Sequence, residues 1–105
     1  MKTEKLIAKF TNFPKDDNFV SGDIGDFQFQ AKLFDGGSPF GIKGGRVSKL
    51  SIWEKNRSLL IINYDRGWDK KPTTANRSIF NAVMELCENS PKRFENEAVT
   101  QNFTE

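Results

Sequence analysis

The segment FQFQAKLF, residues 27–34, alternates strictly between apolar and polar side chains. Its apolar residues at positions 27, 29, 31 and 33 share one side, and its two glutamines and Lys32 share the other. Successive side chains of an extended strand point to opposite faces of a sheet. This segment therefore predicts a strand in a sheet that has one buried face and one face open to water.

Three further segments carry strand patterns: residues 5–13, 46–54 and 58–64. The segment 58–64 is apolar on both sides, which predicts a central or doubly covered strand. The short link at 55–57 predicts a hairpin between the last two strands. The glycines and aspartates of 19–26 suit a bend or hairpin turn, and DGGSPFGIKGG at 35–45 predicts a long irregular loop.

A helix is predicted after Thr73 or Thr74, because either hydroxyl can cap a first turn. Its apolar residues recur at spacings of three and four and form one stripe: Ile79, Phe80, Val83, Leu86 and Cys87. Pro91 ends this helix, and no periodic pattern follows it. The chain thus predicts an α+β fold: an antiparallel meander of four to five strands with one C-terminal helix packed on one face. We expect a single domain over residues 1–90 and a flexible, disordered tail over 91–105.

Composition excludes several kinds of chemistry. The 105 residues contain no His, which excludes Ser-His-Asp and Cys-His catalysis and imidazole zinc sites. The single Cys87 cannot form an internal disulfide, which fits a reducing compartment. No apolar run approaches the roughly 20 residues that span a bilayer, and the N-terminus is too polar for a signal peptide. We therefore expect a cytoplasmic protein without a membrane partner, and no cofactor or metal.

Positive charge concentrates in the middle of the chain. The net charge is +2, but residues 43–78 hold nine Lys or Arg against three Asp or Glu, which gives +6. Trp53, Tyr64 and Trp68 lie in the same segment. Such a composition suits contact with nucleic-acid phosphates and bases, or with an acidic protein surface. It also suits strands and loops whose basic side chains are simply solvated.

Two motifs invite a chemical interpretation. The glycine-rich stretch at 36–45 is not a phosphate-binding P-loop, because Lys43 is followed by Gly44 and the next element is a strand. It predicts a mobile loop, a backbone-specific turn or a contact loop for a partner. In NYDRGWD, residues 63–69, Asp65 and Asp69 could act as acid and base or as metal ligands. Pairing with Arg66 or turn capping is the simpler interpretation, and Trp68 is expected to pack in the core.

The strings GIKGGRVSKLSIW (41–53) and INYDRGWD (62–69), followed by a single helix, resemble a small family of unknown function found in Gram-positive bacteria and their phages. The resemblance covers residues 27–88, and the chain departs from it in Lys70, Lys71 and its longer tail. The family supplies no activity or catalytic residue to carry over. What the resemblance implies is a short protein encoded by a phage or another mobile element, acting in the host cytoplasm.

We expect a non-enzymatic protein that binds a protein partner through the loop 36–45 and the turn 64–72. By analogy of class, that partner is a host defence or CRISPR nuclease, which the protein inhibits. The candidate partner-binding residues are Lys43, Arg46, Lys49, Arg57, Asp65, Arg66, Trp68, Asp69, Lys70 and Lys71.

Two alternatives and the oligomeric state stay open. The first alternative is a nucleic-acid-binding accessory protein that uses the basic segment 43–78, with Lys43, Arg46, Lys49, Arg57 and Arg66 as its contacts. The second is an enzyme that uses Asp65 and Asp69.

Overall fold

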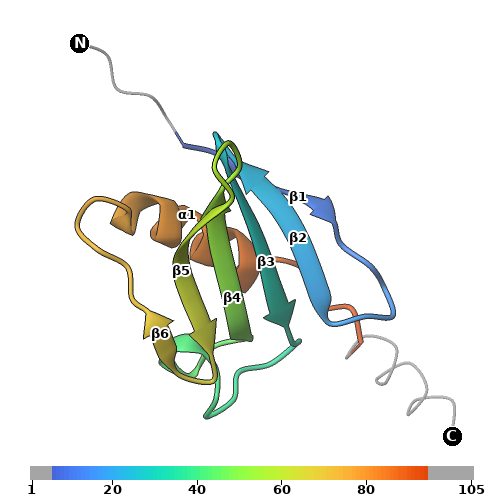
Figure 1. The fold of residues 1–105 in the computed structure, drawn as a ribbon. Helices are drawn as coiled ribbons and strands as arrows, with labels where there is room; N and C mark the ends of the chain where they lie inside the picture. The colour runs from blue at the N-terminus through green and yellow to red at the C-terminus, as the bar shows by residue number, and fades with distance from the viewer. Residues whose placement is uncertain (1–5, 95–105) are drawn as a thin grey trace, which may run out of the picture.

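A computed structural model describes residues 6–94 and shows a six-stranded sheet with one helix behind it (Figure 1). The strands are β1 (Ala8–Asn12), β2 (Phe19–Ile24), β3 (Phe27–Leu33), β4 (Val47–Glu54), β5 (Leu59–Asp65) and β6 (Trp68–Lys70). A short 3-10 helix, η1 (Ile42–Gly44), lies in the loop between β3 and β4, and α1 (Arg77–Glu88) follows the last strand. Each strand pairs antiparallel with the next one along the chain. The predicted α+β meander with a C-terminal helix is thereby confirmed.

The number of strands corrects the expectation of four to five. Residues 19–24 form β2 rather than a turn, and residues 68–70 form a short sixth strand. Gly22 looked like a turn residue, but it pairs with Phe29 inside the sheet. A Cβ at Gly22 would overlap the Phe29 ring and the carbonyl oxygen of Lys9, so the glycine makes room for a core side chain. The turn itself is shorter and uses Gly25, whose φ is 57°.

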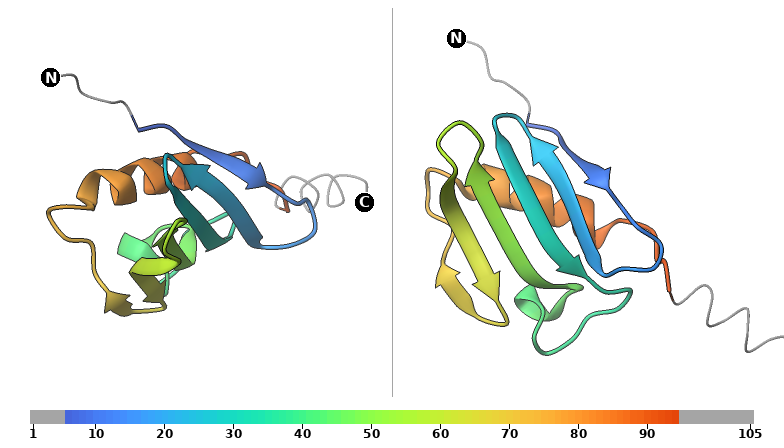
Figure 2. Two further views of the ribbon diagram at one scale, coloured as in Figure 1. Left: turned by 45° about the horizontal axis from the view of Figure 1, so that its top comes forward. Right: turned by 45° about the vertical axis from the view of Figure 1, so that its right-hand side comes forward.

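The helix covers one face of the sheet (Figures 1 and 2). The strands send alternate side chains toward α1, and these are fully buried: Val20, Ile24, Phe29, Leu33, Leu50, Ile52 and Ile62. The helix meets them with Ile79, Phe80, Val83 and Cys87, which belong to the predicted stripe. This single layer of apolar contact forms the core and leaves the opposite face of the sheet without a covering element among residues 6–94.

The helix begins at Arg77, one turn after the expected cap. Thr73 Oγ1 accepts a hydrogen bond from the Asn76 N–H at 3.4 Å, and Asn76 Oδ1 accepts one from the Thr73 N–H at 2.7 Å. This reciprocal pair has the form of a capping box. It closes a turn that precedes the helix, so the Thr73 hydroxyl acts on that turn and not on the first turn of α1.

The expected tail does not begin at Pro91. The Arg93 side chain is buried, and its guanidinium donates to the carbonyl oxygens of Pro14, Asp17 and Leu33 at 2.7 to 2.8 Å. The backbone N–H groups of Arg93 and Phe94 donate to the Asp35 carboxylate. Burial lowers the pKa of Arg93, and the charge of Asp35 opposes that shift. Residues 91–94 therefore belong to the domain, and the rest of the predicted tail, 95–105, lies outside the described residues.

Replacing Arg93 by Gln should lower the free energy of unfolding by about 2–4 kcal/mol, because buried carbonyl groups lose a charged donor. Urea unfolding followed by tryptophan fluorescence measures this change. The control is Arg57→Gln, which removes an exposed ion pair with Glu54 and should cost at most about 0.5 kcal/mol. Equal midpoints for the two variants would contradict a structural role for Arg93.

Candidate functional site

The face of the sheet that points away from α1 carries an ordered row of polar side chains. Cross-strand pairing places Ser21, Gln30, Ser51 and Asn63 in line across four strands. The Ser51 hydroxyl donates to Asn63 Oδ1 at 3.0 Å, and Asn63 Nδ2 donates to the Asp69 carboxylate at 3.1 Å. This row of the open face therefore presents amides and hydroxyls.

The next row, nearer the loop that follows β3, contains two lysines in direct opposition. It runs from Phe19 through Lys32 and Lys49 to Asp65. Like charges placed opposite each other on neighbouring strands repel. Lys32 Nζ lies 5.8 Å from the ring centroid of Phe19, and Lys49 Nζ lies 3.9 Å from Asp65 Oδ2. Ring and carboxylate contacts thus offset part of this repulsion.

The glycine-rich loop is an ordered, backbone-specific turn. The Ser38 N–H donates to the Gly45 carbonyl at 3.2 Å, and a Cβ at Gly41 would overlap that same oxygen. The Tyr64 hydroxyl donates to the carbonyl oxygen of Phe40 at 2.8 Å, which ties the loop to β5. Only glycine allows this close approach of two backbone segments. The loop therefore holds Phe40 in a fixed place beside the open face.

The loop and the turn between β5 and β6 line one hollow of about 450 Å³, which we call the loop-end pocket. Its walls are Lys32, Phe34, Gly36, Gly37, Ser38, Phe40, Ser48 and Arg66. Phe40 is 58 % exposed, and Lys32 Nζ lies 5.5 Å from the centroid of the Phe34 ring. Two rings beside two cations suit a ligand that combines an apolar part with a negative charge.

Arg66 lines this pocket and has a strained backbone conformation. Its φ is 58°, which is uncommon for a residue with a side chain, and its N–H donates to the Ser48 carbonyl at 3.0 Å. Arg66 Nε lies 3.6 Å from Asp65 Oδ1. One carboxylate, Asp65, therefore faces two cations, Lys49 and Arg66.

The predicted candidates divide into separate groups. Arg66 lines the loop-end pocket, and Lys49 and Arg66 both pair with Asp65 beside it. Asp69 contacts Asn63 of the adjoining polar row, and Lys70 is the exposed last residue of β6. Trp68 packs edge-on against Tyr64 and Phe80, as expected for a core anchor. Lys43 and Lys71 line a different hollow, of about 270 Å³, between the end of β6, η1 and the helix. Arg57 lies in the turn between β4 and β5 and pairs with Glu54.

Arg46 is a correction, because it is buried and is no surface contact. Its guanidinium donates to five carbonyl oxygens, those of Phe34, Cys87, Glu88, Ser90 and Pro91, at 2.7 to 3.4 Å. Its backbone N–H donates to the Glu88 carboxylate at 2.8 Å. The C-terminal end of a helix has carbonyl groups without intrahelical partners and a partial negative charge. Arg46 satisfies these groups and joins α1 to the sheet.

Sequence reasoning missed Lys32, Phe34 and Phe40 as pocket residues. The position of Lys32 on the polar side of the alternating segment was a visible signal for an open-face residue. Its opposition to Lys49 was not visible, because the long loop between β3 and β4 leaves the register of the two strands undetermined in the sequence.

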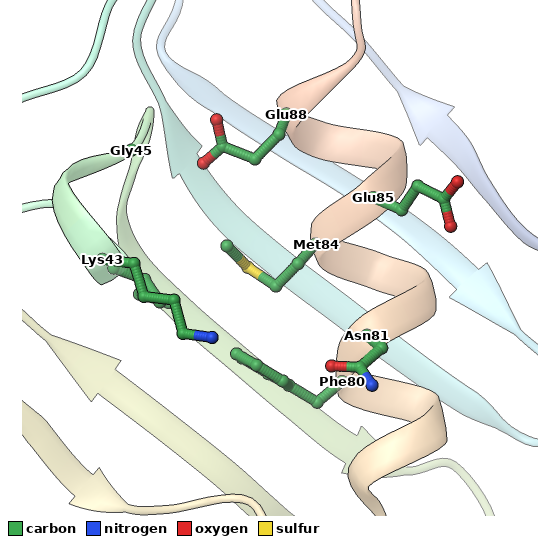
Figure 3. A pocket seen from close by; sticks show the side chains of 8 residues that line it. Lys43, Gly45, Phe80, Asn81, Met84, Glu85 and Glu88 are labelled. Atoms are coloured by element: carbon green, nitrogen blue, oxygen red, sulfur yellow. The ribbon is translucent and has the colours of Figure 1, made fainter.

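A third hollow, of about 370 Å³, lies between η1 and α1 (Figure 3). Phe80 and Met84 extend from the helix toward Lys43, whereas Glu85 points away from η1. Glu88, at the other end, already accepts the Arg46 N–H. This hollow is therefore a gap in the packing of the helix against the loop, with one of its charged groups already engaged.

The titratable groups show no metal cluster within residues 6–94. Asp65 pairs with cations and Asp69 accepts from Asn63, which matches the structural interpretation of these two carboxylates. Burial raises the pKa of the Cys87 thiol to about 12, and the charge of Glu88 adds to the shift. Within the same residues, no helix has the length and apolar character needed to cross a membrane.

These features define a small α+β domain in which one sheet face is covered by a helix and the other is open and polar. Residues 18–88 match the family described as Domain of unknown function (DUF7678), and the chain belongs to this family. The matched residues run from just before β2 to the end of α1 and include the whole loop-end pocket. No curated protein and no solved structure matches the chain.

Replacing Arg46 by Met should lower the free energy of unfolding by about 3–5 kcal/mol, because a methionine fills the space but donates no hydrogen bond to the helix end. Arg66→Gly should leave this free energy unchanged or raise it by up to about 1 kcal/mol, because glycine accepts a positive φ without strain. Urea unfolding of both variants measures these changes in the free energy of unfolding. Similar losses of unfolding free energy in the two variants would contradict a structural role for Arg46 and a surface role for Arg66.

The Cys87 thiol should resist Ellman's reagent at pH 8 in the folded protein and react at once in urea, because it is buried and protonated. Its folded-state pKa lies above the ordinary 9.0, so its contribution to stability is full below pH 9.0 and declines as the pH rises toward about 12. Rapid labelling of the folded protein at pH 8 would contradict this burial.

Proposed function

We propose that this protein is a non-enzymatic binding domain whose loop-end pocket contacts a protein partner. The observation that carries the proposal is the meeting of two distant segments. The loop residues Gly36, Gly37, Ser38 and Phe40 line one pocket together with Arg66. The Tyr64 hydroxyl holds the loop beside the turn by donating to the carbonyl oxygen of Phe40. Both segments belong to the two stretches, 36–45 and 64–72, expected to meet a partner.

The composition of the pocket favours a protein surface. Phe34 and Phe40 offer apolar contact, while Lys32 and Arg66 offer positive charge at the same place. Rings and arginine side chains are enriched at the centres of protein interfaces, where a few residues supply most of the binding free energy. An exposed ring held by an ordered loop also loses little conformational entropy on binding.

The alternatives have less support from the geometry. The nucleic-acid alternative used Lys43, Arg46, Lys49, Arg57 and Arg66. Arg46 is buried, Arg57 lies in the β4–β5 turn and Lys43 lines the hollow between η1 and α1, so these cations do not form one continuous patch. The enzymatic alternative used Asp65 and Asp69, which are engaged by neighbouring side chains.

A finer form of the proposal names the partner. In it, the chain is encoded by a phage or another mobile element and inhibits a host defence or CRISPR nuclease in the host cytoplasm. Its support is the sequence resemblance stated above, together with the suitability of a small binding domain for occluding a larger protein. Co-purification of a defence nuclease with this protein, together with loss of the nuclease's cleavage activity in the complex, would directly support this form of the proposal.

Affinity capture from the native host should identify the partner and its site together. Tagged full-length chain is used as bait after nuclease treatment of the lysate, and mass spectrometry quantifies the captured proteins. Arg66→Glu should reduce recovery of the specific partner at least about tenfold, because it reverses a charge in the wall of the pocket.

The matched control is Arg57→Glu, which reverses the charge of another exposed, ion-paired arginine outside the pocket. It should retain the partner. Equal recovery with both variants would contradict the loop-end pocket as the binding site. Loss of all captured material on nuclease treatment would favour the nucleic-acid alternative instead.

A further inference from the structure

We infer that the loop-end pocket takes an acidic segment of the partner, in which one carboxylate lies among Lys32, Lys49 and Arg66 and an apolar side chain packs on Phe34 and Phe40. Asp65 is then an internal competitor for the same cations. This inference rests on the proposed function, and it specifies the chemistry that the pocket recognises.

The charge arrangement at this end of the face is unbalanced. Lys32 and Lys49 lie opposite each other in the ladder, and Arg66 lines the same pocket as Lys32. Within residues 6–94, the Lys32 ammonium contacts two rings and has no carboxylate within ion-pair distance. Lys49 and Arg66 therefore share Asp65 while Lys32 has no carboxylate partner, and a carboxylate from outside would relieve the mutual repulsion of the three cations.

The internal carboxylate is bound weakly enough to be replaced. Asp65 lies 3.9 Å from Lys49 Nζ and 3.6 Å from Arg66 Nε, and its side chain is 46 % exposed. Exposed pairs at such distances contribute little to stability. Lys49 and Arg66 can therefore turn to an incoming carboxylate at small cost, and Asp65 reduces the affinity for that carboxylate by repulsion.

The walls of the loop-end pocket also indicate that the ligand has an apolar part. Phe40 is one of the few large apolar side chains of residues 6–94 that stay exposed, and Phe34 lies beside Lys32. A ligand that places an apolar side chain next to its carboxylate would cover both rings while its charge reaches the cations. Removing such a side chain from water favours binding.

A nucleic-acid strand also combines negative charge with rings, but the open face is less suited to it. Asp23, Asp65 and Asp69 lie along the face on different strands. A continuous phosphate backbone crossing the sheet would pass these carboxylates, whereas a short acidic segment confined to the pocket meets only Asp65. Charge complementarity therefore favours the acidic protein segment.

Fluorescence anisotropy with defined probes tests the inference. The probes are a labelled capped peptide of alternating glutamate and phenylalanine, the same peptide with glutamine for glutamate, and a labelled oligothymidylate. At low salt, full-length protein should bind the acidic peptide at least about tenfold more tightly than the neutral one, and the difference should shrink as salt is added.

Variants separate the roles of the charged groups. Lys32→Gln should weaken binding of the acidic peptide about fivefold or more, and Asp65→Asn should strengthen it about threefold, because a repelling carboxylate is removed. Lys55→Gln is the control, since Lys55 pairs with Asp23 and lines no part of the pocket. Urea unfolding of each variant shows that it is folded.

Each outcome decides the question. Equal binding of the acidic and neutral peptides, an unchanged affinity for Lys32→Gln, or weaker binding by Asp65→Asn would overturn the acidic segment as ligand. Tighter binding of oligothymidylate than of the acidic peptide would replace it with nucleic acid. If neither peptide binds while partner capture still depends on Arg66, the proposed binding function stands and only the inferred ligand chemistry is wrong.

Discussion

The guanidinium of Arg46, the residue just before β4, joins the end of the helix to the sheet, and the arrangement of the two layers depends on this contact. It supplies charged donors to carbonyl groups that a helix end leaves unpaired. The Glu88 carboxylate accepts a hydrogen bond from the Arg46 N–H, so the helix and the start of the strand are joined at two points. With α1 fixed against one face, the opposite face is left to the polar rows and the pocket.

The charges and rings of the open face come together through pairing between strands rather than through any one motif. Lys32 and Lys49 are 17 positions apart in the chain and become neighbours only through the β3–β4 ladder. Phe40 reaches the same place because glycines let its loop fold back on its own backbone. The site is thus a product of topology, built from residues that carry no recognisable signature in sequence.

Much of the fold could be predicted from the sequence, because strict alternation at 27–34 and the stripe on α1 leave little choice of structure. The second strand could not, since Gly22 has the composition of a turn and acts by making room for Phe29. Of the candidate site, the turn that contains Asp65 and Arg66 was predicted. The part played by Lys32 was not, because its neighbours depend on how β3 is aligned with β4. Arg46 and Arg93 were misplaced because a charged side chain enters a core only where carbonyl groups converge, and sequence does not show that convergence.

The two outer edges of the sheet have a consequence for how partners approach. The last strand, Trp68–Lys70, has three residues, and β1 is irregular between Phe10 and Asn12. Short or irregular edges with lysines discourage another chain from adding a strand, and so limit association between copies through their backbones. In the proposed binding function, a partner would therefore contact side chains on the open face of the sheet, where specificity depends on charge and shape rather than on generic backbone pairing.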